Sequence, residues 1–325
     1  MWDLHAHVIP PAVLDAAQEG RLGMNLFEGQ LSIDGHRMPY RTLTDLDALK
    51  NYSLRSGLNL VLSVPPGLFR YQLSREDAKE WSRLVNGGIQ QIIGSSAGRY
   101  RGFLLVPLQY PDLAAQEWKR HAGPDWLGVV AGTSINGHGL EEPPFLGFWE
   151  IFEEYRQVCF VHAVDAPDSR LGPYYLSNLL GYPYEDTWCV ARLLFSGLPI
   201  RFAQTRWCIS HGGGGAAALL GRWQWGYETQ RPGIDRGLPA PREIFQKLWF
   251  DCLTHDAGAL RLLLEHAAPH HVVAGSDYPF PMGMSEVFET PIQISSPLSD
   301  VMPAGDRLLR VNDTKRGTHS ETLYD

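Results

Sequence analysis

Eight short apolar runs alternate with helical patterns along most of this 325-residue chain, and this alternation strongly constrains its fold. Near-continuous apolar runs are typical of strands that are buried on both faces. Strands that alternate with helices predict a parallel sheet, and eight such units favour an α/β fold of the closed (β/α)8 TIM-barrel type over a doubly wound sheet. A barrel takes about 250 residues plus insertions, so residues 1–325 are predicted to form one domain. The predicted strands are Trp2–His7, Leu58–Val64, Gly102–Leu108, Leu127–Thr133, Val158–Ala163, Arg206–His211, Lys247–Leu253 and His271–Asp277.

Helical patterns fill most of the intervals between these runs. Thr44 and the acidic residues that follow it predict one helix start, and Ser74 followed by Glu76 and Asp77 predicts another, because hydroxyl side chains cap helices and acids favour their first turn. Five further helices are predicted over Asp112–Ala122, Phe145–Arg156, Asp186–Gln204, Ala216–Gln230 and Asp256–Ala267.

Two segments do not fit the repeating unit. Residues 8–41 separate the first strand from its helix, contain Pro10-Pro11, and are too long for an ordinary connection in a barrel. We expect them to form a small insertion over the face where substrates bind. Residues 283–325 are rich in Ser, Pro and Asp, with a brief helical pattern over Asp306–Val311. They are predicted to form a C-terminal extension that wraps the barrel or makes an oligomer contact.

A pair of histidines on the first predicted strand, together with histidines and an aspartate at the ends of later strands, indicates a metal site. His5 and His7 are one residue apart on a strand, so their rings point to the same side. The carboxyl ends of all barrel strands meet at one face, which brings His162, His211 and Asp277 near this pair. His5, His7, His162 and Asp277 suit zinc (Zn2+), and Mn2+, Co2+ or Fe2+ can occupy similar ligands. The alternative for any one histidine is a hydrogen-bonded structural role.

His211 is the candidate acid and base of this site, because neutral imidazole near a cation can take a proton from metal-bound water. It precedes four glycines, Gly212–Gly215, which allow close approach of the backbone to a ligand and leave open N–H donors at the helix that starts at Ala216. A tight turn without a ligand is the alternative. His255 follows the seventh strand and is a candidate for the shell around the metal ligands.

Composition limits the partners and the compartment. The formal net charge is −8 and no basic stripe is present, which argues against nucleic acid as a partner. No apolar run approaches the roughly 20 residues that span a bilayer, so no membrane partner is expected. The four cysteines include no C-x-x-C pair and are predicted to be free thiols in a reducing compartment. No signal peptide is expected, because cleavage would remove His5, so the predicted location is cytoplasmic.

Several motifs carry a resemblance to a known family. They are Asp3–His7, Ser63–Pro65, Val106–Gln109, Phe160–His162, Ser210–Gly214 and Gly275–Gly283. From Asp3 to about Met284 the chain resembles the metal-dependent amidohydrolase superfamily, most closely the branch that contains 2-amino-3-carboxymuconate 6-semialdehyde decarboxylase. The Gly275–Gly283 motif and the His211 glycine run are distinctive for this branch.

The resemblance implies roles for individual residues. It implies that His5, His7, His162 and Asp277 bind zinc and that His211, together with Asp277, is catalytic. It implies that Arg37 holds a substrate carboxylate and that Arg222 does so in the active site of a neighbouring subunit, which requires a homodimer. Guanidinium groups suit such bidentate binding; without the resemblance, each arginine is more simply a surface charge. The chain departs from the family at Ala163-Val164 and at Asn178, where the family has other residues in the pocket wall, and this leaves the substrate open.

These observations predict a metal-dependent, non-oxidative decarboxylase, a carbon–carbon lyase, that acts on a small unsaturated or aromatic carboxylic acid similar to aminocarboxymuconate semialdehyde. The sequence leaves two mechanisms open, addition of hydroxide and direct protonation of the ring. It also leaves open a metal-dependent hydrolase of a lactone or amide, and a catalytically idle barrel that serves as a binding protein.

Overall fold

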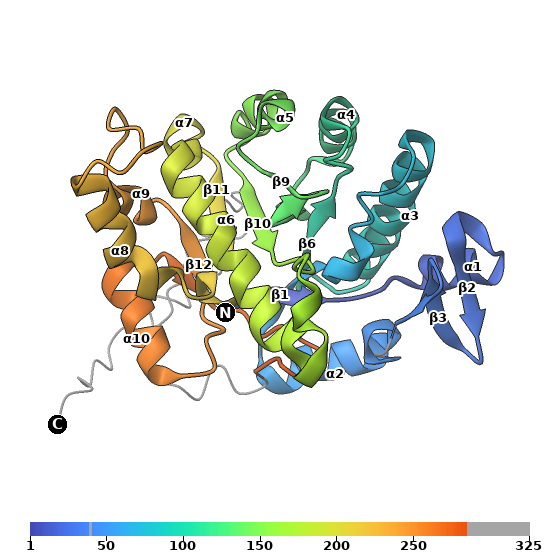
Figure 1. The fold of residues 1–325 in the computed structure, drawn as a ribbon. Coiled ribbons are helices and arrows are strands. Elements are labelled where there is room, and N and C mark those ends of the chain that lie inside the picture. Colours follow the sequence, from blue (N-terminus) through green and yellow to red (C-terminus); the bar gives the residue numbers. More distant parts are fainter. Residues whose placement is uncertain (39–40, 285–325) are drawn as a thin grey trace.

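A computed structural model of the chain describes residues 1–38 and 41–284 and shows the predicted barrel (Figure 1). Its main sheet has eight parallel strands in the order β1-β5-β6-β7-β10-β11-β12-β13. All eight predicted strands are present, which confirms the fold class. Their bounds are β1 Trp2–His7, β5 Asn59–Ser63, β6 Tyr100–Leu105, β7 Trp126–Gly132, β10 Val158–His162, β11 Arg206–Ile209, β12 Trp249–Asp251 and β13 Val272–Val273.

The barrel closes where the segment after β13 lies along β1. The amide of Leu4 donates to the carbonyl of Ala274 at 2.9 Å, and the amide of Asp277 donates to the carbonyl of His5 at 2.8 Å. The amide of His7 then donates to the carbonyl of Tyr278 at 2.7 Å. These bonds place Asp277 directly beside the two histidines of β1, although more than 260 residues separate them in the chain.

Helices surround the sheet (Figure 1). Ser74 caps its helix as predicted, whereas the helix predicted to start at Thr44 is capped by Asp45, whose side chain accepts from the amide of Ala48 at 2.8 Å. The helix predicted over residues 186–204 begins earlier and breaks at Gly197, whose φ of 70° is left-handed and ends the helix. The helices are α2 Leu46–Ser56, α3 Arg75–Gly94, α4 Pro111–His121, α5 Pro143–Glu153, α6 Tyr182–Ser196, α7 Leu198–Arg201, α8 Ala216–Glu228, α9 Pro241–Phe245 and α10 Ala257–His266.

Shorter elements lie in the connections. A hairpin of β8 and β9 follows β7, and short helical turns precede α6 and α8. Their bounds are β8 Ser134–Ile135, β9 His138–Gly139, and the turns Arg21–Gly23, Arg41–Thr44, Pro66–Leu68, Ser169–Leu171, Pro173–Tyr175, Ser177–Gly181 and His211–Gly213.

The segment after β1 has a regular structure of its own. It forms α1 (Pro11–Gln18) and a three-stranded antiparallel sheet of β2 (Met24–Phe27), β3 (Gln30–Ile33) and β4 (His36–Arg37). In Figure 1 this unit lies beside α3 at the edge of the barrel. That residues 8–41 cover the substrate face stays a prediction. Nearly all of the predicted extension 283–325, including Asp306–Val311, lies outside the described residues.

The interior of the barrel is closely packed. The side chains of β1, β7 and β10 are all buried, as the apolar runs predicted. Cys159, Cys189, Cys208 and Cys252 are buried free thiols. No helix in the described part of the chain combines the length and apolar character needed to cross a membrane.

Candidate metal centre and active site

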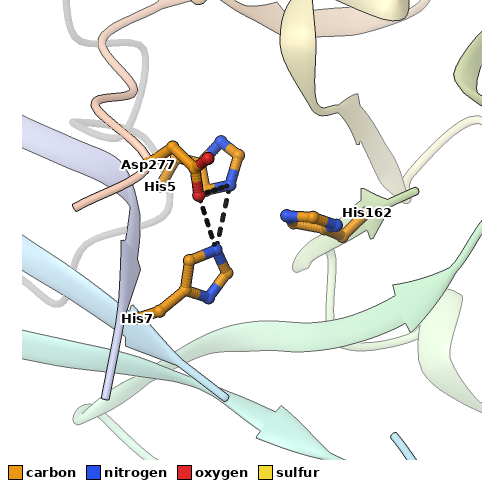
Figure 2. A group of neighbouring side chains, drawn as sticks. All are labelled: His5, His7, His162 and Asp277. Carbon is orange, nitrogen blue, oxygen red and sulfur yellow. Dashed lines mark hydrogen bonds and ion pairs between the residues drawn. The ribbon is translucent and has the colours of Figure 1, made fainter. Parts of the chain in front are cut away.

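Four side chains from three strand ends meet at one buried point (Figure 2). They are the predicted ligands His5, His7, His162 and Asp277, and one ligand atom from each lies within 4.8 Å of the others. The Nε2 atoms of His5 and His7 are 3.1 Å apart. Oδ1 of Asp277 lies 3.2 Å from the first and 3.1 Å from the second. The structure therefore brings together all four residues that the sequence predicted as ligands.

Each of the three histidines has its other ring nitrogen, Nδ1, against an oxygen of the surrounding protein. A carbonyl or carboxylate oxygen can only accept, so Nδ1 carries the proton of the neutral imidazole, and in that neutral form Nε2 presents its lone pair. The second ring nitrogen of a metal-binding histidine commonly has such a partner. The pairs are His5 with Asp251 Oδ2 at 2.7 Å, His7 with the Val64 carbonyl at 3.2 Å, and His162 with the Ala163 carbonyl at 2.8 Å.

The free atoms of this cluster fit a cation. Nε2 of His162 is buried and has no hydrogen-bond partner within the described residues, and Oδ1 of Asp277, also buried, lies against the ring nitrogens of His5 and His7. Converging lone pairs in a buried site repel one another unless a proton or a metal lies between them. Three imidazole nitrogens and one carboxylate oxygen match the ligand preferences of zinc and of related divalent metals. The cluster can therefore hold a divalent metal.

The charges in the cluster are strongly coupled. Burial disfavours the charged form of His5, but the carboxylates of Asp277 and Asp251 outweigh it and raise the pKa of His5 to about 10. Burial also disfavours ionised Asp277, yet His5 and His7 outweigh it and hold the pKa of Asp277 well below its usual value. Burial and the nearby His5 lower the pKa of His162 far below its usual value. Without a metal, His5 thus keeps a proton among these ligand atoms.

Asp3 and Gly275 explain why β1 and the end of the barrel fit so closely here. Asp3 accepts from the amide of His5 at 3.0 Å, and from the amide and the hydroxyl of Ser276 at 3.0 and 2.5 Å. A side chain at Gly275 would place its Cβ 2.9 Å from that of His5 and 2.7 Å from that of Asp251. Glycine at this position therefore allows β1, β12 and the segment before Asp277 to meet.

His211 lies next to the cluster and is held by a buried carboxylate. Its ring centroid is 5.0 Å from that of His162 and 5.3 Å from that of His5. Its Nδ1 lies 2.8 Å from Oδ2 of Asp186, which is buried on α6 and also accepts from the Ser210 hydroxyl at 3.0 Å. Burial opposes protonation of His211, but Asp186 outweighs it and raises the pKa of this imidazole.

Comparison with known proteins agrees with this arrangement. The model of the amidohydrolase family matches residues 2–290. The chain belongs to the amidohydrolase family.

The relatives and solved structures similar to this amidohydrolase include several decarboxylases. It is 30% identical to a 2-amino-3-carboxymuconate-6-semialdehyde decarboxylase of Dictyostelium discoideum over 69% of this chain and 63% of that protein. It is 37% identical to the protein of that name from Caenorhabditis elegans over 42% of this chain and 35% of that one. The matched stretches thus span less than two thirds of either relative.

Two crystal structures show the same fold. The 5-carboxyvanillate decarboxylase of Sphingomonas paucimobilis superposes with a TM-score of 0.75 at 22% identity, over 96% of this chain and 98% of that one. A dihydroxybenzoic acid decarboxylase from a Polaromonas species, with bound manganese and the inhibitor 2-nitroresorcinol, has a TM-score of 0.72 at 17% identity, over 100% and 99% of the two chains.

A cavity of about 370 Å³ opens beside His211 and Asp277 in this amidohydrolase. A second cavity, of about 80 Å³, lies against His162, His211 and Asp277. Both have Asn178 and Tyr182 in their walls, and the Tyr182 ring is parallel to that of His211 at 6.3 Å. The candidate metal ligands and His211 therefore border space that a small molecule can occupy.

The glycine run after His211 is a tight turn whose own amides are used within the protein. The amide of Gly212 donates to Oδ1 of Asp251 at 2.8 Å, and that of Gly215 donates to the Thr187 hydroxyl at 2.8 Å. The other two glycine amides donate to the carbonyls of Ser210 and His211. The four glycine amides are therefore used within the protein, and the open N–H donors expected at the start of the helix at Ala216 stay a prediction.

Neither predicted substrate-binding arginine of this amidohydrolase lines these cavities in the single chain. Arg37 is exposed on β4, with its guanidinium 4.5 Å from the centre of the Phe27 ring. Arg222 is exposed on α8. His255 lines the larger cavity, but its Nε2 lies 2.6 Å from the Met282 carbonyl and not against a candidate metal ligand.

Sequence reasoning missed two carboxylates that hold the site together, Asp186 and Asp251. Asp251 ends an apolar strand, and the sequence pattern predicts Asp186 only as a helix start. A buried charge requires a partner. An acid inside a predicted core strand or helix is therefore the sequence signal that could have identified these two carboxylates. The sequence could not show which histidine each acid contacts.

Proposed function

We propose that this amidohydrolase is a metal-dependent, non-oxidative decarboxylase of a small unsaturated or aromatic carboxylic acid. One observation carries the proposal: His211, held by Asp186, borders the same cavity as Asp277 of the candidate metal cluster. A proton carrier next to a cation site is what removal of carbon dioxide from a conjugated acid requires. The names of the relatives support the same reaction class.

Zinc is the metal we propose first, held by His5, His7, His162 and Asp277. Three nitrogens and one oxygen suit it, while the manganese in the Polaromonas structure makes Mn2+ the main competitor. When bound, a divalent metal supplies Lewis acidity toward an oxygen of the substrate.

His211 would handle the proton. Its Nδ1 donates to Asp186, so its Nε2 is the atom available to hold or deliver a proton at the cavity. In the reaction the bond between the ring or chain carbon and the carboxylate breaks, its electron pair stays on the carbon, and carbon dioxide leaves. A proton then reaches that carbon, and we assign its delivery to His211, with Asp277 as the neighbouring carboxylate.

The cavity restricts the substrate to a small molecule. A volume of about 370 Å³ is near the lower end for ligand pockets and suits one ring with its substituents. The described lining of both cavities contains no lysine or arginine. Among the described residues of a single chain, the metal site and the histidines are therefore the groups at these cavities that can attract a substrate carboxylate.

We propose that a homodimer supplies the missing positive charge, with Arg222 of the partner subunit reaching the cavity and Arg37 holding the substrate from its own chain. On α8, Leu219, Arg222 and Trp225 follow at intervals of three residues, which places them along one side of the helix. Leu219 is 39% exposed and Trp225 is 66% exposed. Large apolar side chains exposed on both sides of an arginine favour burial against a second copy of this chain.

We also propose a reducing, cytoplasmic location, supported by the four buried free thiols. Fractionation of cells that express the tagged chain tests this location.

The decisive experiment combines elemental analysis of the purified protein with assays of carbon dioxide release from carboxylated muconates and hydroxybenzoates. We expect about one divalent metal per chain and stoichiometric carbon dioxide from at least one acid. Ring opening of a lactone or amide without carbon dioxide would instead establish a hydrolase. Full activity after complete metal removal would contradict the proposal.

A further inference from the structure

Asn178 occupies a particular place in the described site. It belongs to the short helical turn Ser177–Gly181 that leads into α6. Its side chain is half-buried and lines both the 370 Å³ cavity and the 80 Å³ cavity. It therefore borders both of the cavities that lie beside the candidate metal cluster.

Apart from Asp277 and Nε2 of His211, which belong to the candidate metal and proton sites, the other polar side chains in the wall of the larger cavity already have partners. The Tyr182 phenol bonds with Asp165, and the Thr254 hydroxyl donates to the Asp256 carbonyl at 3.1 Å. Nδ1 of His211 bonds with Asp186, and Nε2 of His255 bonds with the Met282 carbonyl. Within residues 1–38 and 41–284, the carboxamide of Asn178 makes no hydrogen bond, so it is available to a ligand.

The surroundings of Asn178 favour an apolar ring. Leu179, Pro183, Ala217, Leu263 and Met282 line the same cavity. Such side chains contact the flat faces and edges of a ring, while a few polar groups select its substituents. A carboxamide offers two N–H donors and one acceptor and carries no charge. It matches a hydroxyl, which both donates and accepts, better than it matches a second carboxylate.

We propose that Asn178 determines specificity by hydrogen bonding to a hydroxyl on the ring of an aromatic carboxylic acid. This inference rests on the proposed function only in taking the cavity as the substrate site. A hydrogen bond between neutral groups contributes about 1 kcal/mol. We therefore expect loss of the carboxamide to weaken binding of the hydroxylated acid about 5- to 10-fold and to leave the acid without the hydroxyl nearly unchanged.

The test compares Asn178→Leu, which keeps the size of the side chain, with the wild type. Metal-loaded protein is titrated calorimetrically with benzoate, 2-hydroxybenzoate and 2,6-dihydroxybenzoate, and kcat/KM is measured for every acid that is turned over. Asn51→Leu is the control, because Asn51 is exposed on α2 away from both cavities. Asn178→Ser is a second variant that retains a hydrogen-bonding group if the leucine variant folds poorly.

The inference holds if Asn178→Leu lowers the preference for a hydroxylated acid over benzoate and Asn178→Ser retains part of it. Equal losses for all three acids, no loss, or no binding of any of them by the wild type would overturn it. If Asn178→Leu releases carbon dioxide from every acid as fast as the wild type, the inference about Asn178 is wrong and the proposed function still holds. If binding depends on the hydroxyl but no acid releases carbon dioxide, the inference about Asn178 holds and the proposed function is wrong.

Discussion

Asp251 accepts a hydrogen bond from Nδ1 of His5 at 2.7 Å, and both side chains are fully buried. The other oxygen of Asp251 accepts from the amide of Gly212, the residue after His211. One carboxylate thus orients a candidate metal ligand and the turn that carries the candidate proton carrier. Loss of such a partner typically costs about 10- to 100-fold in metal affinity.

We therefore predict that Asp251→Asn weakens metal binding by about 10- to 100-fold, because a carboxamide would orient His5 less firmly and the substitution removes a nearby negative charge. Competition with a chelator measures this affinity. Asp256→Asn is the matched control, since Asp256 caps α10 and contacts none of the metal ligands. Equal affinity in Asp251→Asn and wild type would contradict an orienting role.

Metal binding is predicted to release a proton. Burial disfavours protonated His5, but the carboxylates of Asp277 and Asp251 raise its pKa to about 10, so below that pH the metal-free protein keeps a proton on His5. Since a metal needs the neutral imidazole, about one proton should leave for each metal bound at pH 7–8, and affinity should rise with pH. Calorimetry in two buffers of different ionisation enthalpy measures the number of protons released. A binding heat that is the same in both buffers would contradict the release of a proton from His5.

Asp277→Ala should lower metal content, because it removes the only carboxylate among the four candidate ligands. The Asp277 side chain is buried, and the buried carboxylates of Asp251 and Asp186 already pair with His5 and His211. Elemental analysis after dialysis against a weak chelator measures the change. Asp112→Ala, at an exposed position on α4, should stay fully loaded. Unchanged stoichiometry in Asp277→Ala would show that this residue is not a ligand.

His211→Ala is predicted to keep its metal and to lower turnover by roughly 10²- to 10⁴-fold, the range for loss of a general acid or base. Its ring is near the cluster, but it is not one of the four converging ligand residues. Metal analysis and single-turnover kinetics separate the two effects. His138→Ala is the control, because His138 is exposed in the β8–β9 hairpin. Full turnover by His211→Ala would refute the role of His211.

Arg222 gives a prediction about assembly. If Arg222 acts across a dimer interface, mixing Arg222→Ala subunits with His211→Ala subunits creates mixed dimers that have one intact site. Random exchange should then restore about a quarter of wild-type activity, although each variant alone is nearly inactive. The assay is turnover before and after subunit exchange. Absence of any recovery in verified mixed dimers would indicate that each chain works alone.

The sequence predicted much of the site because its signals are local. His5 and His7 share one strand, and His162 and Asp277 each follow an apolar run, so the rule that parallel strands end at one face was enough to group them. The strand bounds were predicted less well near β13, where only Val272–Val273 pair regularly before the chain turns toward Asp277. The break at Gly197 was missed because the helical pattern continues on both sides of it.

Residue order was sufficient to predict the barrel, the four residues of the metal cluster and His211, because strand periodicity and the shared face of strand ends depend only on position along the chain. The folded chain was needed to show that Asp251 orients His5, that Asp186 holds His211, and that Asn178 faces the cavities without a partner among the described residues. It also placed Arg37 and Arg222 on the surface of the single chain. These contacts depend on distances and directions of a few ångströms between residues far apart in the sequence, and residue spacing does not encode them.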